Sequence, residues 1–145
     1  MRFPYTVFPA RPDAAFPDRQ TISRPILTVT LERGELSIAA FAIVDSGADN
    51  CLFPASLAIQ LGIAIPNQNT YVFSGTAEQG QIAYFETVQA TVWNGNRGER
   101  PLRFQLYAGF CDTLEHIGMG LLGQQGFFSR FKVHFVQPEN FFELS

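Results

Sequence analysis

Alternation of apolar and polar residues predicts that this chain is built mainly from β-strands. In the segment "PILTVTL" (residues 25–31), leucine and valine alternate with threonine, which is typical of a strand with one buried face, and the following "ERGE" predicts a turn. The next apolar run, "LSIAAFAIV" (residues 36–44), predicts a second strand. Further alternating segments lie at residues 88–92, 102–106 and 131–135. We therefore expect an all-β architecture.

Two breaks in this alternation predict short helical elements. Pro54 can begin a helix, because it lacks the amide hydrogen that a first helical turn leaves unbonded, and Gly62 can end it. Apolar residues between them recur every four positions. The second break follows Leu121 and Leu122, where the sequence predicts a single helical turn.

The segment "TYVFSGTAEQGQIAYF" (residues 70–85) predicts a hairpin. Its two flanks are rich in residues that favour strands, and "SGTAEQG" (residues 74–80) separates them as a polar, glycine-bearing tip. We expect this tip to move.

An acid follows directly on the apolar run that ends at Val44. Burying the ionised carboxylate of Asp45 is unfavourable unless hydrogen bonds and neighbouring groups offset the desolvation. The triplet Asp45-Ser46-Gly47 supplies them, since Gly47 allows a tight turn whose backbone amides point back at the carboxylate and the Ser46 hydroxyl can brace a neighbouring strand. We therefore expect a rigid loop that presents the carboxylate. Taken in isolation, the same triplet is typical of ordinary turns.

The composition fits one folded domain preceded by an extended arm. The chain has 145 residues, of which 46% are hydrophobic, so it can bury one core but is too short for two ordinary domains. Five of the nine prolines lie between Pro4 and Pro25, which excludes a regular helix or a central strand there. We expect residues 1–24 to form a proline-rich arm and residues 25–145 to form the domain with its C-terminal tail.

The charge and the cysteines exclude several classes of function. The net charge is −3 and the ten Lys and Arg residues form no basic run, so we expect no nucleic acid partner. Cys51 and Cys111 lie far apart in the sequence, and His116 and His134 lack the spacing of metal ligands. We expect two buried thiols, with a redox role left open for Cys51, and no metal or other cofactor.

The chain also lacks membrane and export signals. Every apolar stretch is shorter than the roughly 18 residues that a membrane-spanning helix needs, and the N-terminus has no apolar leader segment. We therefore expect a cytoplasmic protein without a membrane partner.

The order of the motifs resembles that of the retropepsin-like aspartic proteases, the family of the retroviral protease and its bacterial relatives. The matching features are "AIVDSGADNCLFP" (residues 42–54), the glycine-bearing hairpin and "GLLGQQGFFSRFKVHF" (residues 120–135). The resemblance runs from about Pro25 to Phe135. It implies a retropepsin-like closed β-barrel with a flap hairpin, psi-type loops and one or two short helices. In that family the late Leu-Leu-Gly strand passes beneath the Asp-Ser-Gly loop.

The resemblance implies roles for two segments of the chain. Asp45 would be the catalytic aspartate, with Ser46 and Gly47 fixing its loop. The hairpin around residues 75–80 would be the flap. Substrate would be bound by Ala48, Asp49, Ser74, Gly75 and Thr76. Retroviral members often place an arginine after the late glycine, to pair with the acid that matches Asp49, whereas this chain has Gln124.

One Asp-Ser-Gly triplet implies two copies of the chain. Aspartic protease chemistry uses two carboxylates on one water: one takes the proton of the water while the other, protonated, polarises the peptide carbonyl. Asp112-Thr113 continues into Leu114, so the chain has no second triplet. We expect a homodimer whose two Asp45 carboxylates share one proton. We also expect the tail "NFFELS" (residues 140–145) at the dimer seam, because a single copy would expose its phenylalanines.

Several functions are compatible with these residues. The leading hypothesis is a homodimeric aspartic endopeptidase that hydrolyses a peptide or protein substrate without a cofactor. The alternative is a catalytically weak or inactive retropepsin-fold module that dimerises or binds peptides, because a fold does not guarantee activity. A hydrolase of non-peptide esters is less attractive, since the Ser-His context of such enzymes is missing. At the level of single residues, Asp45 could be a plain turn residue and Asp49 could cap the helix near Pro54.

Overall fold

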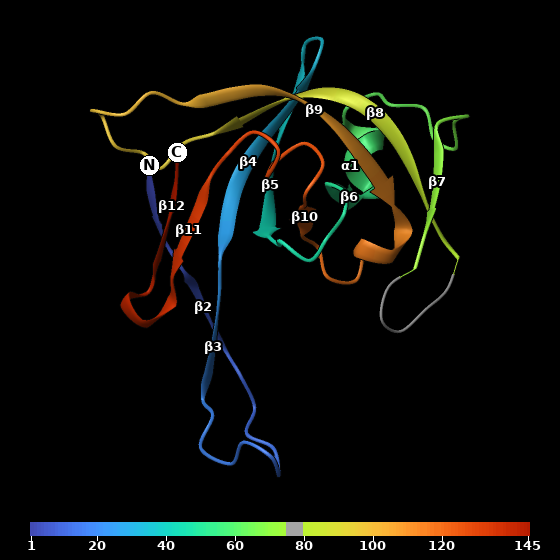
Figure 1. Cartoon of the computed structure of the whole chain (residues 1–145). Coiled ribbons are helices and arrows are strands. Elements are labelled where there is room, and N and C mark those ends of the chain that lie inside the picture. Colours follow the sequence, from blue (N-terminus) through green and yellow to red (C-terminus); the bar gives the residue numbers. More distant parts are fainter. Residues whose placement is uncertain (75–79) are drawn as a thin grey trace.

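The computed structural model describes residues 1–74 and 80–145, and strands dominate it (Figure 1). The described strands are β1 (Arg2–Pro4), β2 (Thr6–Pro9), β3 (Thr21–Arg24), β4 (Ile26–Arg33), β5 (Leu36–Val44), β6 (Leu52–Pro54), β7 (Thr70–Phe73), β8 (Gln81–Val92), β9 (Leu102–Cys111), β10 (Gly120–Leu122), β11 (Val133–Val136) and β12 (Phe141–Leu144). The described helices are α1 (Ala55–Gln60) and the 3₁₀ helices η1 (Asp112–Leu114) and η2 (Gln137–Glu139).

Six strands close into a barrel around the core. They follow the order β4-β5-β10-β6-β9-β8, and the pairing of β4 with β8 closes the ring, while β7 lies outside it against β8. Leu27, Val29 and Leu31 of β4 are buried, and the residues between them are exposed or partly exposed. The predicted alternation and the closed, all-β barrel are thus confirmed.

The strand β10 gives the barrel its psi-type arrangement. β5 and β6 follow one another in the chain, yet they are not neighbours in the sheet, because β10 lies between them. β10 runs parallel to β5 and antiparallel to β6. The late Leu-Leu-Gly segment therefore passes the end of β5, where Asp45 follows.

The predicted helix after Pro54 is present, and the single helical turn predicted after Leu121 and Leu122 is present too. α1 begins after Pro54, and Gly62 follows its end with a φ of +65°, a conformation that glycine adopts without strain. After β10 the chain makes one turn in which the Phe131 amide donates to the Phe127 carbonyl at 3.0 Å. Phe127 is fully buried there, so the turn is anchored in the core.

The segment before β4 forms three short strands that lie at sheet edges. β1 is the outer strand of a sheet with the order β1-β12-β11, and β2 and β3 pair with one another as a separate ribbon. Edge strands tolerate proline because one side of the strand forms no ladder bonds. Pro4 and Pro9 accordingly stand at the ends of β1 and β2.

The C-terminal tail contributes to the core of its own chain. Phe142 and Leu144 on β12 are 0% and 2% exposed. The Phe142 ring stacks on Phe3 with centroids 5.5 Å apart and meets Tyr5 edge-on. The expectation that these side chains would be exposed on a single copy is therefore wrong, because pairing of β12 with β1 covers them.

The cysteines are free and buried beneath the barrel surface. Cys51 is 0% exposed, and its sulfur accepts the Gly123 amide at 3.3 Å. Burial raises the pKa of the Cys51 thiol from 9.0 to about 11, while backbone hydrogen bonds act in the opposite direction. Cys51 is thus a neutral thiol that fills space between β6 and the segment after β10.

We predict that Cys51 makes stability fall at alkaline pH. Because the folded chain holds the pKa above its unfolded value, the thiol stabilises the fold fully below about pH 9, and this contribution is lost as the pH rises through about 11. Denaturant unfolding from pH 8 to 11 measures it, with Cys51→Ala as the control whose curve is flatter. Rapid reaction of both native thiols with a thiol reagent at pH 8 would contradict the burial.

We predict that Phe142→Ala lowers the free energy of unfolding by about 3–5 kcal/mol, since it removes a fully buried ring from a packed cluster. Urea denaturation of the two proteins measures the difference. Phe41→Ala is the matched control, because the Phe41 ring is 59% exposed and its loss should change stability by less than about 1 kcal/mol. Equal losses for the two variants would show that β12 does not belong to the core.

Candidate active site

Asp45 opens a tight loop, residues 45–50, that connects β5 to β6. The Gly47 amide donates to Asp45 Oδ1 at 2.9 Å, and the Ala48 amide donates to the Asp45 carbonyl at 3.2 Å. A Cβ atom on Gly47 would lie 3.2 Å from the same carboxylate oxygen, so a side chain there would crowd it. The loop thus turns its own amide toward the carboxylate, as the sequence predicts.

Backbone hydrogen bonds hold this loop against β10 and the residues that follow it. They join the Asp45 amide to the Leu122 carbonyl at 3.1 Å, the Gln124 amide to the Ala48 carbonyl at 2.8 Å and the Gln125 amide to the Asp49 carbonyl at 2.8 Å. The loop is therefore fixed at its start and near its end, which limits where the carboxylate can lie.

Gly123 makes this close approach possible. A Cβ atom at position 123 would lie 2.5 Å from the Ala48 carbonyl oxygen and 2.4 Å from the Asn50 carbonyl oxygen. Side-chain carbons essentially never come that close to backbone oxygen, so any other residue would push the two segments apart. The glycine of the late motif is therefore needed for packing under the loop.

A glutamine side chain gives the loop one more support. Gln124 Nε2 donates to the Ser46 carbonyl at 2.6 Å, across 78 positions of sequence. The expected bracing by the Ser46 hydroxyl is not seen: this residue is exposed, and within residues 1–74 and 80–145 its hydroxyl forms no hydrogen bond. Ser46 therefore accepts support from a neighbouring segment and does not give it, because the turn points its side chain to solvent and leaves its carbonyl facing Gln124.

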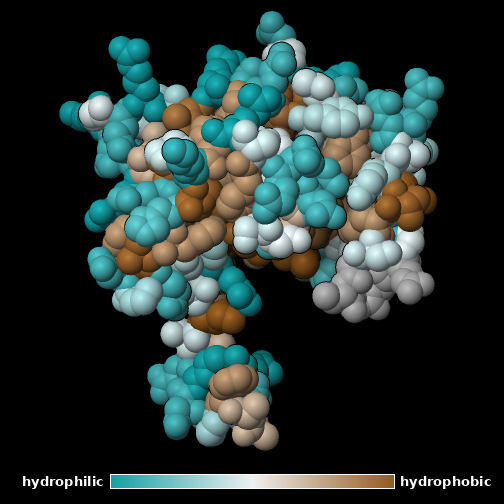
Figure 2. All heavy atoms as spheres, viewed as in Figure 1, coloured by the Kyte–Doolittle hydropathy of each residue, from teal (hydrophilic) through white to brown (hydrophobic). Residues whose placement is uncertain are grey.

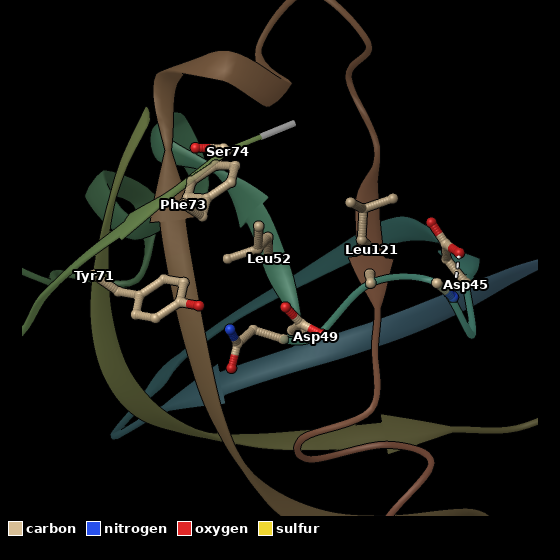
Figure 3. A pocket seen from close by; sticks show the side chains of 10 residues that line it. Asp45, Asp49, Leu52, Tyr71, Phe73, Ser74 and Leu121 are labelled. Atoms are coloured by element: carbon tan, nitrogen blue, oxygen red, sulfur yellow. Dashed lines mark hydrogen bonds between the residues drawn. The ribbon is translucent and has the colours of Figure 1, made fainter. Parts of the chain in front are cut away.

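The loop forms one wall of a pocket of about 400 Å³. Its lining residues come from the loop, from β6, from β7 and the residue after it, and from β10: Asp45, Gly47, Ala48, Asp49, Asn50, Leu52, Tyr71, Phe73, Ser74 and Leu121. Figure 3 shows Asp45 to one side of Leu121 and the other labelled residues, Asp49 among them, to its other side. The pocket therefore combines two carboxylates with an apolar wall.

Two carboxylates, Asp45 and Asp49, set the electrostatics of the pocket. Asp45 is partly exposed and Asp49 is exposed. Neither of them forms an ion pair with a lysine, arginine or histidine in the described part of the chain. A carboxylate fixed in this way can accept a proton or a hydrogen bond from a bound molecule.

Asp49 does not cap the helix that follows. Instead, Glu115 accepts the Ser56 amide at 2.5 Å and the Ser56 hydroxyl at 3.1 Å, at the first turn of α1. The capping alternative for Asp49 is therefore wrong. Glu115 lies 59 positions away in sequence, so no local capping pattern could indicate it.

Most of the predicted site residues meet at this one pocket. Asp45, Gly47, Ala48, Asp49 and Ser74 line it. Ser46 belongs to the same loop but does not line the pocket. The predicted flap residues Gly75 and Thr76 lie outside the described residues. The flanks of the predicted hairpin, β7 and β8, are antiparallel partners, with Phe73 opposite Gln81.

The described residues hold neither a metal-binding cluster nor a membrane-spanning helix. In residues 1–74 and 80–145, no three His, Cys, Asp or Glu side chains gather as ligands of a metal ion. In the same residues, no helix has the length and apolarity needed to cross a bilayer.

Comparison with known proteins finds a likeness of structure but none of sequence. No family model matches the chain, and no curated protein matches it. The crystal structure of a retropepsin-like aspartic protease from Rickettsia conorii is similar to it, with a TM-score of 0.52 and 15% sequence identity over 98% of this chain and 95% of that one. With the barrel, the psi-type crossing and the Asp45 loop in place, this likeness shows that the chain has the retropepsin-like fold.

Proposed function

We propose that this protein is a homodimeric aspartic endopeptidase in which Asp45 from each of two copies acts on one water molecule. The observation that carries the proposal is the Asp45 carboxylate itself, which the Gly47 amide and the bonds to β10 fix at the edge of a pocket whose described lining residues include no Lys, Arg or His. This arrangement supplies half of the pair that the chemistry needs. The buried free thiols suit a reducing compartment, so we place the activity in the cytoplasm.

The chemistry follows from pairing two such carboxylates. Two carboxylates a few Å apart repel one another strongly, so the pair holds one proton between them. The ionised partner takes a proton from the water as it attacks the peptide carbonyl, and the protonated partner donates a hydrogen bond to the carbonyl oxygen. Neither step requires a metal or an organic cofactor.

The pocket suggests how an extended peptide would bind. β7 is the outer strand beside the barrel, so its free edge can pair with a substrate strand. Leu52, Phe73 and Leu121 offer an apolar wall to a substrate side chain. Ala48, Asp49 and Ser74 would contact the substrate backbone, and closure of the hairpin that contains Gly75 and Thr76 would exclude water.

The alternative remains a dimerising or peptide-binding module with this fold. Two observations favour it: Gln124 supports the Ser46 carbonyl, and Asp49 forms no ion pair within the described residues. Retroviral members often have an arginine at this position, so the support of the loop differs from theirs. The variant that removes the Asp45 charge separates this module from the enzyme.

We predict that Asp45→Asn lowers peptide cleavage by about 10³-fold and leaves the dimer intact, because it removes the proton acceptor and a repulsive charge. Cleavage of a diverse peptide library between pH 3 and 7, with light scattering for the mass, measures both properties. Asp112→Asn is the matched control, an exposed acid outside the pocket, and should cleave normally. Absence of cleavage by the wild-type protein would favour the module instead.

We predict that Asp49→Asn raises KM about tenfold with kcat changed less than about twofold, since it weakens one charged hydrogen bond to the substrate backbone in ground and transition state alike. Steady-state kinetics on one cleaved peptide measures both constants. A loss of kcat as large as that of Asp45→Asn would instead place Asp49 in the chemistry.

A further inference from the structure

The β2–β3 hairpin stands apart from the rest of the molecule. Its two strands pair only with one another, with Thr6 opposite Arg24 and Pro9 opposite Thr21. Figure 1 shows it projecting beyond the barrel, and Figure 2 shows its tip as a separate lobe. A ribbon of two strands is marginally stable in water when nothing packs against it. A partner surface that covers the hairpin would stabilise it.

The tip of this hairpin has a defined structure of its own. Asp13 Oδ1 accepts the amides of Ala15 and Phe16 at 3.0 and 2.8 Å. Asp13 also pairs with Arg19 at 2.8 Å, and the Arg19 guanidinium lies 4.6 Å from the centre of the Phe16 ring. The tip thus presents a fixed surface, as a binding element does.

The hairpin exposes apolar side chains along its length. Val7 is 52% exposed and Phe16 is 56% exposed. At its base a cavity of about 200 Å³ opens between the hairpin and the barrel, lined by Thr6, Phe8, Ile26, Thr28, Phe41 and Met119. Apolar side chains are therefore exposed at the stem and at the tip, and a cavity lined mainly by apolar residues lies at the base. Exposed apolar groups of this kind suit contact with another protein.

The base of the hairpin lies next to the 45–50 loop, which carries Asp45 and is called the catalytic loop below. The chain leaves β3 and enters β4 at Ile26, whose register partner is Ile43, and the Pro25 carbonyl accepts the Val44 amide at 2.9 Å. Asp45 is the next residue. The hairpin projects in the direction in which β5 ends, which is the side where Asp45 emerges (Figure 1).

This position determines which molecule the hairpin meets. In the proposed enzyme the second copy must approach on the side of Asp45, because the two carboxylates share one water. Roughly nine extended residues separate the base from the tip, which gives a reach of up to about 30 Å at about 3.3 Å per residue. A hairpin of that length at that place is long enough to reach along the side of the second copy.

The charges fit the same partner. Arg11 and Arg24 of the hairpin form no ion pair within the described residues, and neither do Asp45 and Asp49 of the catalytic loop. Two copies that meet on this side bring Arg11 and Arg24 of each hairpin toward the side of the other copy that carries Asp45 and Asp49, and opposite charges that face one another favour association.

We propose that the β2–β3 hairpin is a dimerisation arm that packs on a second copy of this chain. The inference rests on the proposed homodimer and adds to it the element that holds the copies together. A two-fold axis makes the contact reciprocal, so each arm covers the flank of the other copy.

The test removes the arm without disturbing its base. Thr6 and Arg24 are register partners, so replacing residues 7–23 with Asn-Gly joins them through a two-residue turn. We expect the dimer dissociation constant, measured by analytical ultracentrifugation, to rise at least tenfold, with an unchanged circular dichroism spectrum. The double variant Val7→Asp/Phe16→Asp keeps the arm and should weaken the dimer similarly. Ile59→Asp, at a 71% exposed position on α1, is the control and should not weaken it.

A cross-linking measurement gives a second, independent readout. Phe16→Cys adds an exposed thiol to a chain whose own two thiols are buried, so a benzophenone maleimide labels the arm selectively. Illumination should give a product with the mass of two chains, and Ile59→Cys should not. Products within single chains only, or an arm-deleted protein that dimerises as tightly as the wild type, would overturn the proposal.

The outcomes separate this inference from the proposed function. An arm-deleted protein that still dimerises and cleaves peptide overturns the arm and leaves the enzyme standing. A wild-type dimer that cleaves nothing, with an arm-deleted protein that is monomeric, supports the arm and contradicts the enzyme. Even weak dimers form at a concentration of about 100 µM. A wild-type chain that remains a monomer there overturns both the dimerisation arm and the homodimeric enzyme.

Discussion

The hydrogen bonds between the 45–50 loop and the segment after β10 are the constraint on which the rest of the site depends. They place an acid at the end of a buried strand and keep its carboxylate at the pocket edge. Gly123 allows the two segments to approach, and the buried thiol of Cys51 fills the space beneath them. The barrel closes around this crossing, so the position of Asp45 is determined by the fold and by the local turn together.

Local patterns in the sequence were sufficient to predict the strands and the Asp45 loop, whereas the closed barrel was predicted from the resemblance of the motifs to a known family. The alternation of Leu27, Val29 and Leu31 identified a strand because every second side chain of a strand faces the core. Gly47 identified the turn, because only a residue without a side chain leaves room beside the carboxylate. Pro54 and Gly62 marked the limits of α1, since each acts on its own backbone. All of these signals operate within a few residues.

Contacts between distant segments could not be predicted in this way. The bond from Gln124 to the Ser46 carbonyl and the capping of α1 by Glu115 depend on how β10 and η1 pack, which one sequence does not reveal. The tail is a second example. Phe142 was predicted to be exposed, because the strand that covers it, β1, lies at the opposite end of the chain. The prolines of the first segment indicated an extended arm without a helix or a central strand, but they could not reveal which edge strands it would form or which segments those strands would pair with.

The central claim is that two Asp45 carboxylates from separate copies form one catalytic site, and subunit mixing tests it most directly. Wild-type protein and Asp45→Asn are unfolded together in known ratios, refolded, and assayed for peptide cleavage at one total concentration. If both carboxylates are required, mixed dimers are inactive, and activity falls as the square of the wild-type fraction. Activity that falls in direct proportion to the wild-type fraction would mean that each chain works alone, and would contradict the account.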